Sequence, residues 1–228
     1  MRKIAWVVLS LTLGFAFPVR AQMGMDLFKR PSIAKVFHPV VGKGAQYEDT
    51  SKDAGSGQKP RTMELATVGK ESVEGKEGYW MQFVLIDDKG QTTIGKSLIT
   101  VDDFQYHKFI IQAPGQPAME MPFTLAAGRR EKMQDNLEGW HSAGSEPVSV
   151  PAGTFLCEHW RNDKTNSDVW TSDKVTPFGM VKESNPHSSM VLTKVLGDVP
   201  DRITGPVQKI DPQMMMQQMQ QRRQQQKP

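Results

Sequence analysis

The chain has 228 residues, of which 28 are lysine or arginine and 25 are aspartate or glutamate, and its formal net charge is +3. This near balance lacks the concentrated basic character of nucleic-acid-binding domains, so we expect no nucleic-acid partner. The only cysteine is Cys157, which excludes an internal disulfide. The fold must therefore be stabilised by burial and hydrogen bonding.

The first 21 residues have the layout of a secretory signal peptide. Arg2 and Lys3 precede an apolar run over residues 4–17, and Val19 and Ala21 supply the small residues that signal peptidase recognises. The run of 14 residues is shorter than the about 20 needed to span a bilayer, so we expect cleavage after Ala21 and no transmembrane anchor in the mature protein. The sequence therefore predicts a periplasmic or secreted protein.

Three further regions follow the predicted signal peptide. We expect an entry segment at residues 22–34, an antiparallel β domain at residues 35–206 and a tail at residues 207–228. The tail is rich in glutamine and methionine and can bury little surface, so it is predicted to be disordered or a lone helix. Its methionines, from Met214 to Met219, would suit Cu(I), but we favour a flexible tail whose methionines contact a partner or nothing, and we expect no metal site.

Short strands dominate the predicted β domain. Residues 61–68 alternate apolar and polar side chains with the period of two that is typical of a half-buried strand. Residues 79–86 and 92–101 are predicted to pair as a hairpin across a turn at 87–90. Further strands are expected at residues 36–48, 104–112, 119–125, 148–150, 154–161, 167–172, 180–183 and 189–196.

This pattern predicts a mainly β fold. About ten strands at spacings of about ten residues favour a curved antiparallel sheet, half-barrel or barrel-like, with a sandwich as the alternative. We expect one or two short helices, of which residues 126–138 are the clearest candidate. A parallel α/β fold is disfavoured because helical crossovers are missing.

One sequence pattern in the second half of the chain, within residues 148–182, resembles that of a known family. Residues 148–160 place a Pro-Ala-Gly turn before Phe155 and end at Trp160, and residues 168–182 contain Trp170 followed by Thr-Ser. The pattern resembles bacterial envelope proteins that are similar to the lipoprotein-sorting proteins LolA and LolB. That resemblance, over about a third of the chain, implies an open half-barrel that shelters acyl chains. The helical lid of such carriers is nearly absent here, and no binding residue of the family can be placed in this sequence.

If the resemblance holds, aromatic residues on the strands would line a groove for a lipid or another apolar ligand. Each of these residues taken singly is more often core packing than a ligand contact. The candidates for the groove are Trp80, Phe83, Phe109, Phe155 and Trp170.

Patterns that would indicate catalysis are weak. The sequence has no Gly-x-Ser-x-Gly elbow and no phosphate-binding or dinucleotide-binding loop. Cys157 and His159 can share a strand face, but a buried and inert thiol is the interpretation we favour. The histidines lie too far apart in the sequence to indicate a zinc site, at His38, His107, His141, His159 and His187.

We therefore expect a non-catalytic envelope protein without a cofactor that binds a lipid or another apolar molecule. One alternative is a structural or protein-interaction module with an envelope protein as its partner. Another is a hydrolase or a metal-handling protein.

Overall fold

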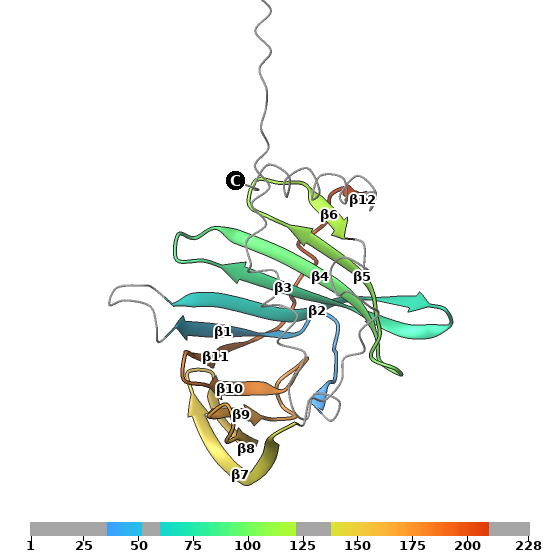
Figure 1. Ribbon diagram of the computed structural model, residues 1–228. Helices are drawn as coiled ribbons and strands as arrows, with labels where there is room; N and C mark the ends of the chain where they lie inside the picture. The colour runs from blue at the N-terminus through green and yellow to red at the C-terminus, as the bar shows by residue number, and fades with distance from the viewer. Residues whose placement is uncertain (1–35, 52–59, 122–137, 210–228) are drawn as a thin grey trace, which may run out of the picture.

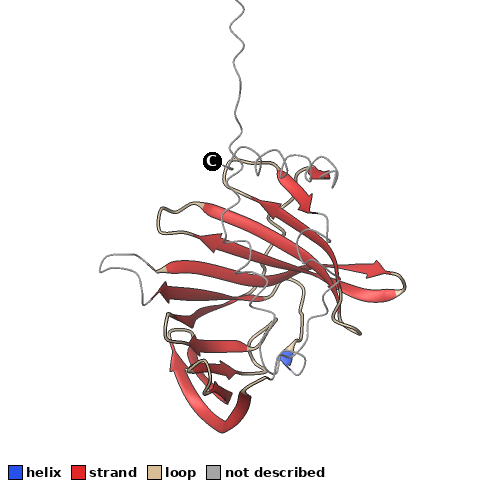
Figure 2. Ribbon diagram, in the orientation of Figure 1, coloured by secondary structure: helices blue, strands red, loops and turns tan. Residues whose placement is uncertain are grey.

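A computed structural model describes residues 36–51, 60–121 and 138–209, which form one sheet of twelve strands (Figure 1). The strands are β1 (Gly44–Ser51), β2 (Arg61–Val73), β3 (Lys76–Ile86), β4 (Thr92–Thr100), β5 (Tyr106–Gln112), β6 (Ala118–Met121), β7 (Trp140–Val150), β8 (Gly153–Asn162), β9 (Ser167–Thr171), β10 (Met180–Ser184), β11 (Ser188–Leu196) and β12 (Val207–Lys209). Figure 2 shows strand in nearly all of the regular structure, which confirms the predicted mainly β fold and its curved sheet. None of the described residues belongs to a helix long and apolar enough to cross a bilayer.

The sheet consists of two meanders joined by one long-range pair. Strands β1 to β6 pair in chain order, strands β7 to β11 pair in chain order, and β11 pairs with β1. All of these pairs are antiparallel, whereas β12 adds to the edge of β6 in parallel. The order leaves β12 and β7 as the two ends, so the sheet is open.

The predicted hairpin is present and its turn is built by one carboxylate. Strands β3 and β4 pair from Ile86 opposite Thr92 back to Gly78 opposite Thr100. The side chain of Asp87 accepts hydrogen bonds from the backbone amides of Lys89 (2.9 Å) and Gln91 (2.8 Å), which closes the connection.

Some boundaries differ from the predicted ones. Strand β7 begins at Trp140, eight residues before the expected start at Val148. Its first part is exposed on both faces and contains Gly144 and Pro147, so no apolar alternation marks it as a strand. The expected helix at residues 126–138 lies almost wholly outside the described residues, as do the signal peptide, the entry segment and the tail beyond Lys209.

The two faces of the sheet bury different side chains, because successive residues of a strand point to opposite sides. We call the larger set the inner cluster and its side of the sheet the inner face. It comprises Ala45, Tyr47, Met63, Leu65, Tyr79, Met81, Phe83, Ile99, Tyr106, Phe109, Ile111, Cys157, Val175, Phe178, Met180, Val181, Met190 and Leu192. The outer cluster is small and contains Ile110, Ala118 and Ile203, with Trp80, Ile94 and Val207 packed against them.

The β7–β8 hairpin rolls over the inner face. Ala152, in the turn between the two strands, donates its backbone amide to the carbonyl of Leu192 on β11 (3.4 Å). Val148 and Val150 of β7 pack against the inner cluster. The roll is visible at the lower end of Figure 1, where β7 curves around β8 and β9.

The chain after β11 crosses the outer face as a strap, which we define as residues 198–206. Gln82 on β3 holds it with two hydrogen bonds, donating to the carbonyl of Pro200 (3.3 Å) and accepting from the amide of Arg202 (2.8 Å). The strap ends in β12, whose three residues are the first of the predicted tail. The domain fold therefore uses residues that the sequence placed in the tail.

Candidate functional site

The structure places the five predicted groove residues on two faces. Phe83 and Phe109 belong to the inner cluster, and Phe155 and Trp170 pack against it. Trp80 lies with the outer cluster, because it alternates with Tyr79 and the inner-facing residues of β3. Four of the five candidates are thus brought to one apolar face, and contact of any of them with a ligand stays a prediction.

A glycine on the neighbouring strand positions Phe83. Phe83 and Gly95 are paired across β3 and β4. A Cβ at Gly95 would lie 2.0 Å from Cζ of Phe83, which shows that the ring lies directly over the glycine. The same ring stacks on Phe109, with 6.2 Å between centroids and an interplanar angle of 17°. The glycine therefore allows the two rings to lie flat on the sheet.

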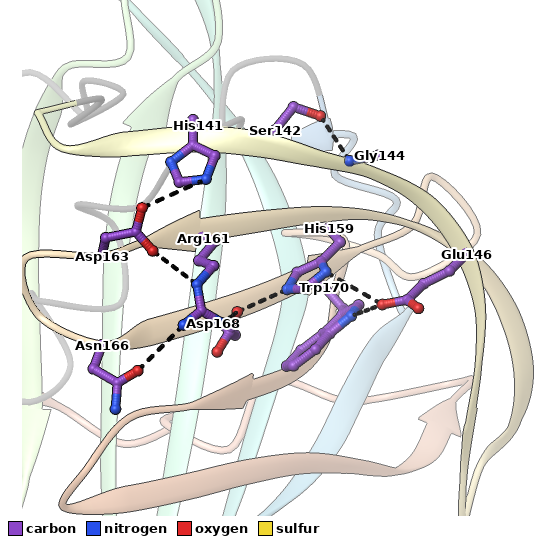
Figure 3. Close-up of polar contacts among 10 residues, drawn as sticks. All are labelled: His141, Ser142, Gly144, Glu146, His159, Arg161, Asp163, Asn166, Asp168 and Trp170. Atoms are coloured by element: carbon purple, nitrogen blue, oxygen red, sulfur yellow. Dashed lines mark hydrogen bonds and ion pairs between the residues drawn. The ribbon is translucent and has the colours of Figure 1, made fainter.

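Polar side chains gather on the rolled end of the inner face, around His159 of β8 (Figure 3). Its Nε2 lies 2.8 Å from Oδ1 of Asp168, and its Nδ1 lies 3.3 Å from Oε1 of Glu146. The imidazole stacks on Trp170 with 4.4 Å between ring centroids, and the indole N–H donates to the same Glu146 oxygen (2.7 Å). Glu146 on β7 is thereby connected to β8 and to β9, and the contacts stabilise the roll.

The indole of Trp170 is flanked on the other neighbouring strand by a cation. The ammonium of Lys182 on β10 lies 4.9 Å from the ring centroid, a favourable cation–π distance. Because His159, Trp170 and Lys182 are consecutive across β8, β9 and β10, the ring is packed between its two neighbours. The observed contacts of Trp170 are therefore structural, because they link β9 to β8 and to β10.

A second group of polar contacts continues toward the β8–β9 turn. Arg161 donates to Asp163 (2.8 Å) and to Asp168 (3.4 Å), and its Nη2 donates to the Asn166 side chain (3.5 Å). His141 on β7 lies 3.9 Å from Asp163. These groups are more exposed than His159 and form a solvated rim around it.

The thiol of Cys157 is close to this network but chemically protected. Burial, together with the charge of its cross-strand partner Glu146, raises its pKa to about 11. A nucleophilic thiolate is disfavoured in such a site. Within the described part of the chain, no group of three or more His, Cys, Asp or Glu side chains is arranged to hold a metal ion.

Rings from outside the strands cover part of the inner cluster. Phe37 precedes β1, Phe104 lies between β4 and β5, and Phe178 lies between β9 and β10. Phe37 stacks on Phe178 (5.2 Å between centroids) and meets Phe104 edge-on (5.8 Å). Phe178 belongs to the cluster, and the other two rings pack against it while partly exposed.

Trp80 has its own polar surroundings on the outer face. Its indole donates to Glu71 (3.0 Å), and the ammonium groups of Lys96 and Lys108 lie 5.0 and 5.7 Å from its ring centroid. Hydrogen bonds from Lys108 and Trp80 lower the pKa of Glu71. Lys96 is itself buried and binds Asp201 of the strap (2.5 Å), so Trp80 lies within the strap attachment.

Sequence reasoning missed the His159 network. The sequence suggested His159 only as a partner of Cys157 on the same strand or as one of five scattered histidines too far apart for a zinc site. The informative signal is the turn at residues 162–166, since a hairpin centred there places His159 opposite Trp170. Glu146 could not be predicted in the same way, because it reaches Trp170 only through the roll of β7.

Comparison with known proteins gives only distant likenesses. No protein-family model matches the chain, and no curated protein matches it.

Among solved structures, the chain is similar to one from Parabacteroides distasonis ATCC 8503 that is provisionally described as a lipoprotein. The identity is 15%, the TM-score is 0.39, and the match covers 70% of this chain and 97% of that one. It is also similar to a provisionally described exported protein with a YmcC-like fold from Bacteroides fragilis NCTC 9343, with 11% identity, a TM-score of 0.38, and coverage of 70% and 98%. Likeness at this level carries no functional argument, and kinship with the LolA/LolB-like proteins stays a prediction.

Proposed function

We propose that this chain is an exported protein of the bacterial cell envelope that binds a lipid or another apolar ligand on the inner face of its sheet. Export is supported by the charge, apolar run and small residues of the first 21 positions. Binding is supported by the concentration of Phe83, Phe109, Phe155 and Trp170 around one apolar cluster. The ligand would replace side chains that now cover this cluster.

The observation that carries the proposal is the nature of that cover. An apolar sheet face normally packs against a second layer of helices or strands. In the described part of the chain, the inner cluster is covered instead by the rolled β7–β8 hairpin and by single rings from loops, Phe37 and Phe104 among them. Side chains on loops can move aside at lower cost than a packed layer, so this face is suited to exchange its cover for a ligand.

The first test is native mass spectrometry of the protein purified from its own envelope, followed by lipid extraction. We expect a second species heavier than the polypeptide by one defined ligand mass. Phe155→Glu should abolish this species, because it places a charge against the inner cluster. Leu156→Glu is the matched control, since the neighbouring side chain is 67% exposed and points to the other face. A wild-type protein that carries only its polypeptide mass and takes up no lipid on incubation would refute the proposal.

The edge of β7 favours a second candidate function, interaction with an envelope protein. Residues 141–147 of this end strand are all exposed, and end strands can pair with strands of another chain. The strand is interrupted by a register shift beside Gly144 and by Pro147, which has no N–H to donate. A partner strand could therefore pair only with short segments, either between these two positions or on one side of them. Crosslinking from position 145 in the native envelope, against position 89 in the β3–β4 turn as control, tests this candidate. A specific adduct at 145 alone is expected.

A further inference from the structure

Phe104 has an unusual backbone conformation for its residue type. Its φ angle is +51°, in the left-handed region that glycine, asparagine and aspartate adopt more readily than a bulky aromatic residue. The conformation directs the ring onto the inner cluster, where it meets Phe37. The chain thus tolerates a strained backbone in order to hold this ring over the apolar face.

The neighbouring residue Asp103 holds the strained loop closed. Its carboxylate accepts hydrogen bonds from the ammonium of Lys76 (2.6 Å) and from the hydroxyl of Thr100 (2.5 Å). These two contacts lower the pKa of Asp103 to about 2, so the carboxylate stays charged at neutral pH. The amide of Thr100 also donates to the carbonyl of Gln105 (3.0 Å), across the base of the loop.

Phe104 is therefore the part of the cover that is best suited to move. Its ring is partly exposed, its loop is short, and its backbone would lose strain if the loop opened. Phe178, in contrast, is buried within the inner cluster.

We propose that the loop of residues 101–105 is a lid over the inner cluster, with Phe104 as its cover and Asp103 as its latch. The inference rests on the proposed function, because a lid has a purpose only if an apolar molecule reaches this face. When the contacts of Asp103 break, Phe104 returns to an ordinary backbone conformation and its ring leaves the cluster. The lid then admits the ligand without any change in the sheet.

Two variants separate the latch from the cover. Asp103→Ala removes the latch and leaves the ring. Phe104→Gly removes the ring and leaves the latch, because glycine adopts a positive φ without strain. Asp102→Ala is the control, since Asp102 is exposed in the same loop.

Two measurements are made on each protein. Hydrogen exchange of the Thr100 amide reports opening of the loop. The association rate of N-phenyl-1-naphthylamine, a neutral apolar fluorescent probe, reports access to the inner cluster.

We expect Asp103→Ala to increase both the exchange rate and the probe association rate about tenfold. Phe104→Gly should increase only the probe association rate, and Asp102→Ala should change neither. Unchanged exchange in Asp103→Ala would overturn the latch. Probe binding at the same rate in all four proteins would overturn the lid and leave the proposed function standing. Failure of every protein to bind the probe would overturn the lid together with ligand binding at this face.

Discussion

Replacement of Gly95 by alanine should displace Phe83 and destabilise the fold. The added Cβ would lie 2.0 Å from Cζ and 2.3 Å from Cε1 of the buried ring, far inside van der Waals contact. The ring cannot swing away freely, because it is 5% exposed and stacks on Phe109. Overpacking of a core typically costs about 1–3 kcal/mol, and loss of the ring stacking adds about 0.5–1.5 kcal/mol.

A smaller opposing effect must be subtracted. Alanine reduces the conformational entropy of the unfolded chain relative to glycine, which stabilises a protein by about 0.4–1 kcal/mol. The net expectation is a loss of about 0.5–4 kcal/mol in the free energy of unfolding, measured by urea denaturation with circular dichroism. Gly197→Ala is the matched control, because no atom lies within 4 Å of its added Cβ and its φ is not positive.

The assay becomes specific when Phe83→Leu is combined with Gly95→Ala in a double-mutant cycle. A smaller side chain at 83 leaves room for the added methyl group, so the double variant should be more stable than the sum of the single changes predicts. We expect a coupling energy of at least about 1 kcal/mol. A coupling near zero, or a Gly95→Ala variant as stable as Gly197→Ala, would refute the packing of the ring on the glycine.

Three further predictions concern other parts of the fold. Cys157 has a pKa of about 11, so little of it is thiolate at pH 8. We expect it to react with iodoacetamide at least about 100-fold more slowly in the folded protein than in urea, as followed by mass spectrometry. Equal rates would contradict its burial. The folded pKa of Asp103 is depressed to about 2, so its contribution to stability is present above the unfolded pKa of about 3.9 and is lost as the pH falls toward 2. Asp103→Asn should accordingly be less stable than the wild type at pH 7, by at most about 1 kcal/mol, and the difference should shrink between pH 4 and pH 2 in urea titrations. Lys96→Met should lower the free energy of unfolding by about 1–3 kcal/mol, because the carboxylate of Asp201 loses its ammonium partner. Adding Asp201→Asn should recover part of the loss, and no recovery would argue against the strap attachment.

Local patterns predicted the fold well where one face of a strand is buried. Residues 61–68 alternate because one side of β2 packs in the inner cluster, and the acidic turn after Ile86 determines the β3–β4 pairing. The predicted hairpin and the mainly β class are therefore confirmed. Strand β7 was only partly predicted, because its exposed residues have no apolar partner that would impose a period of two.

The candidate site could be predicted only as a set of residue types. Aromatic residues on strands identified Phe83, Phe109, Phe155 and Trp170, but the same criterion also selected Trp80. Assigning a face requires the register of each strand, and a shift of one residue moves a side chain to the other side of the sheet. Periodicity in β3 is blurred because inner and outer positions are both buried, the outer ones beneath the strap.

Contacts between distant segments account for what the sequence could not show. The strap covers the outer face only because Gln82, in the middle of β3, offers both a donor and an acceptor to a backbone 118 and 120 residues further along the chain. Glu146 similarly reaches Trp170 across 24 residues once the β7–β8 hairpin has rolled. A glutamine or glutamate is common on an exposed strand, so neither residue stands out in the sequence. Each acquires its structural role from contact with a distant segment, which local sequence patterns do not predict. The part of the inner cluster beneath Phe37 and Phe104 differs in this respect, because rings from loops rather than polar attachments cover it. This difference is why we place ligand exchange at that part of the inner face, and structural attachment at the strap and at the rolled hairpin.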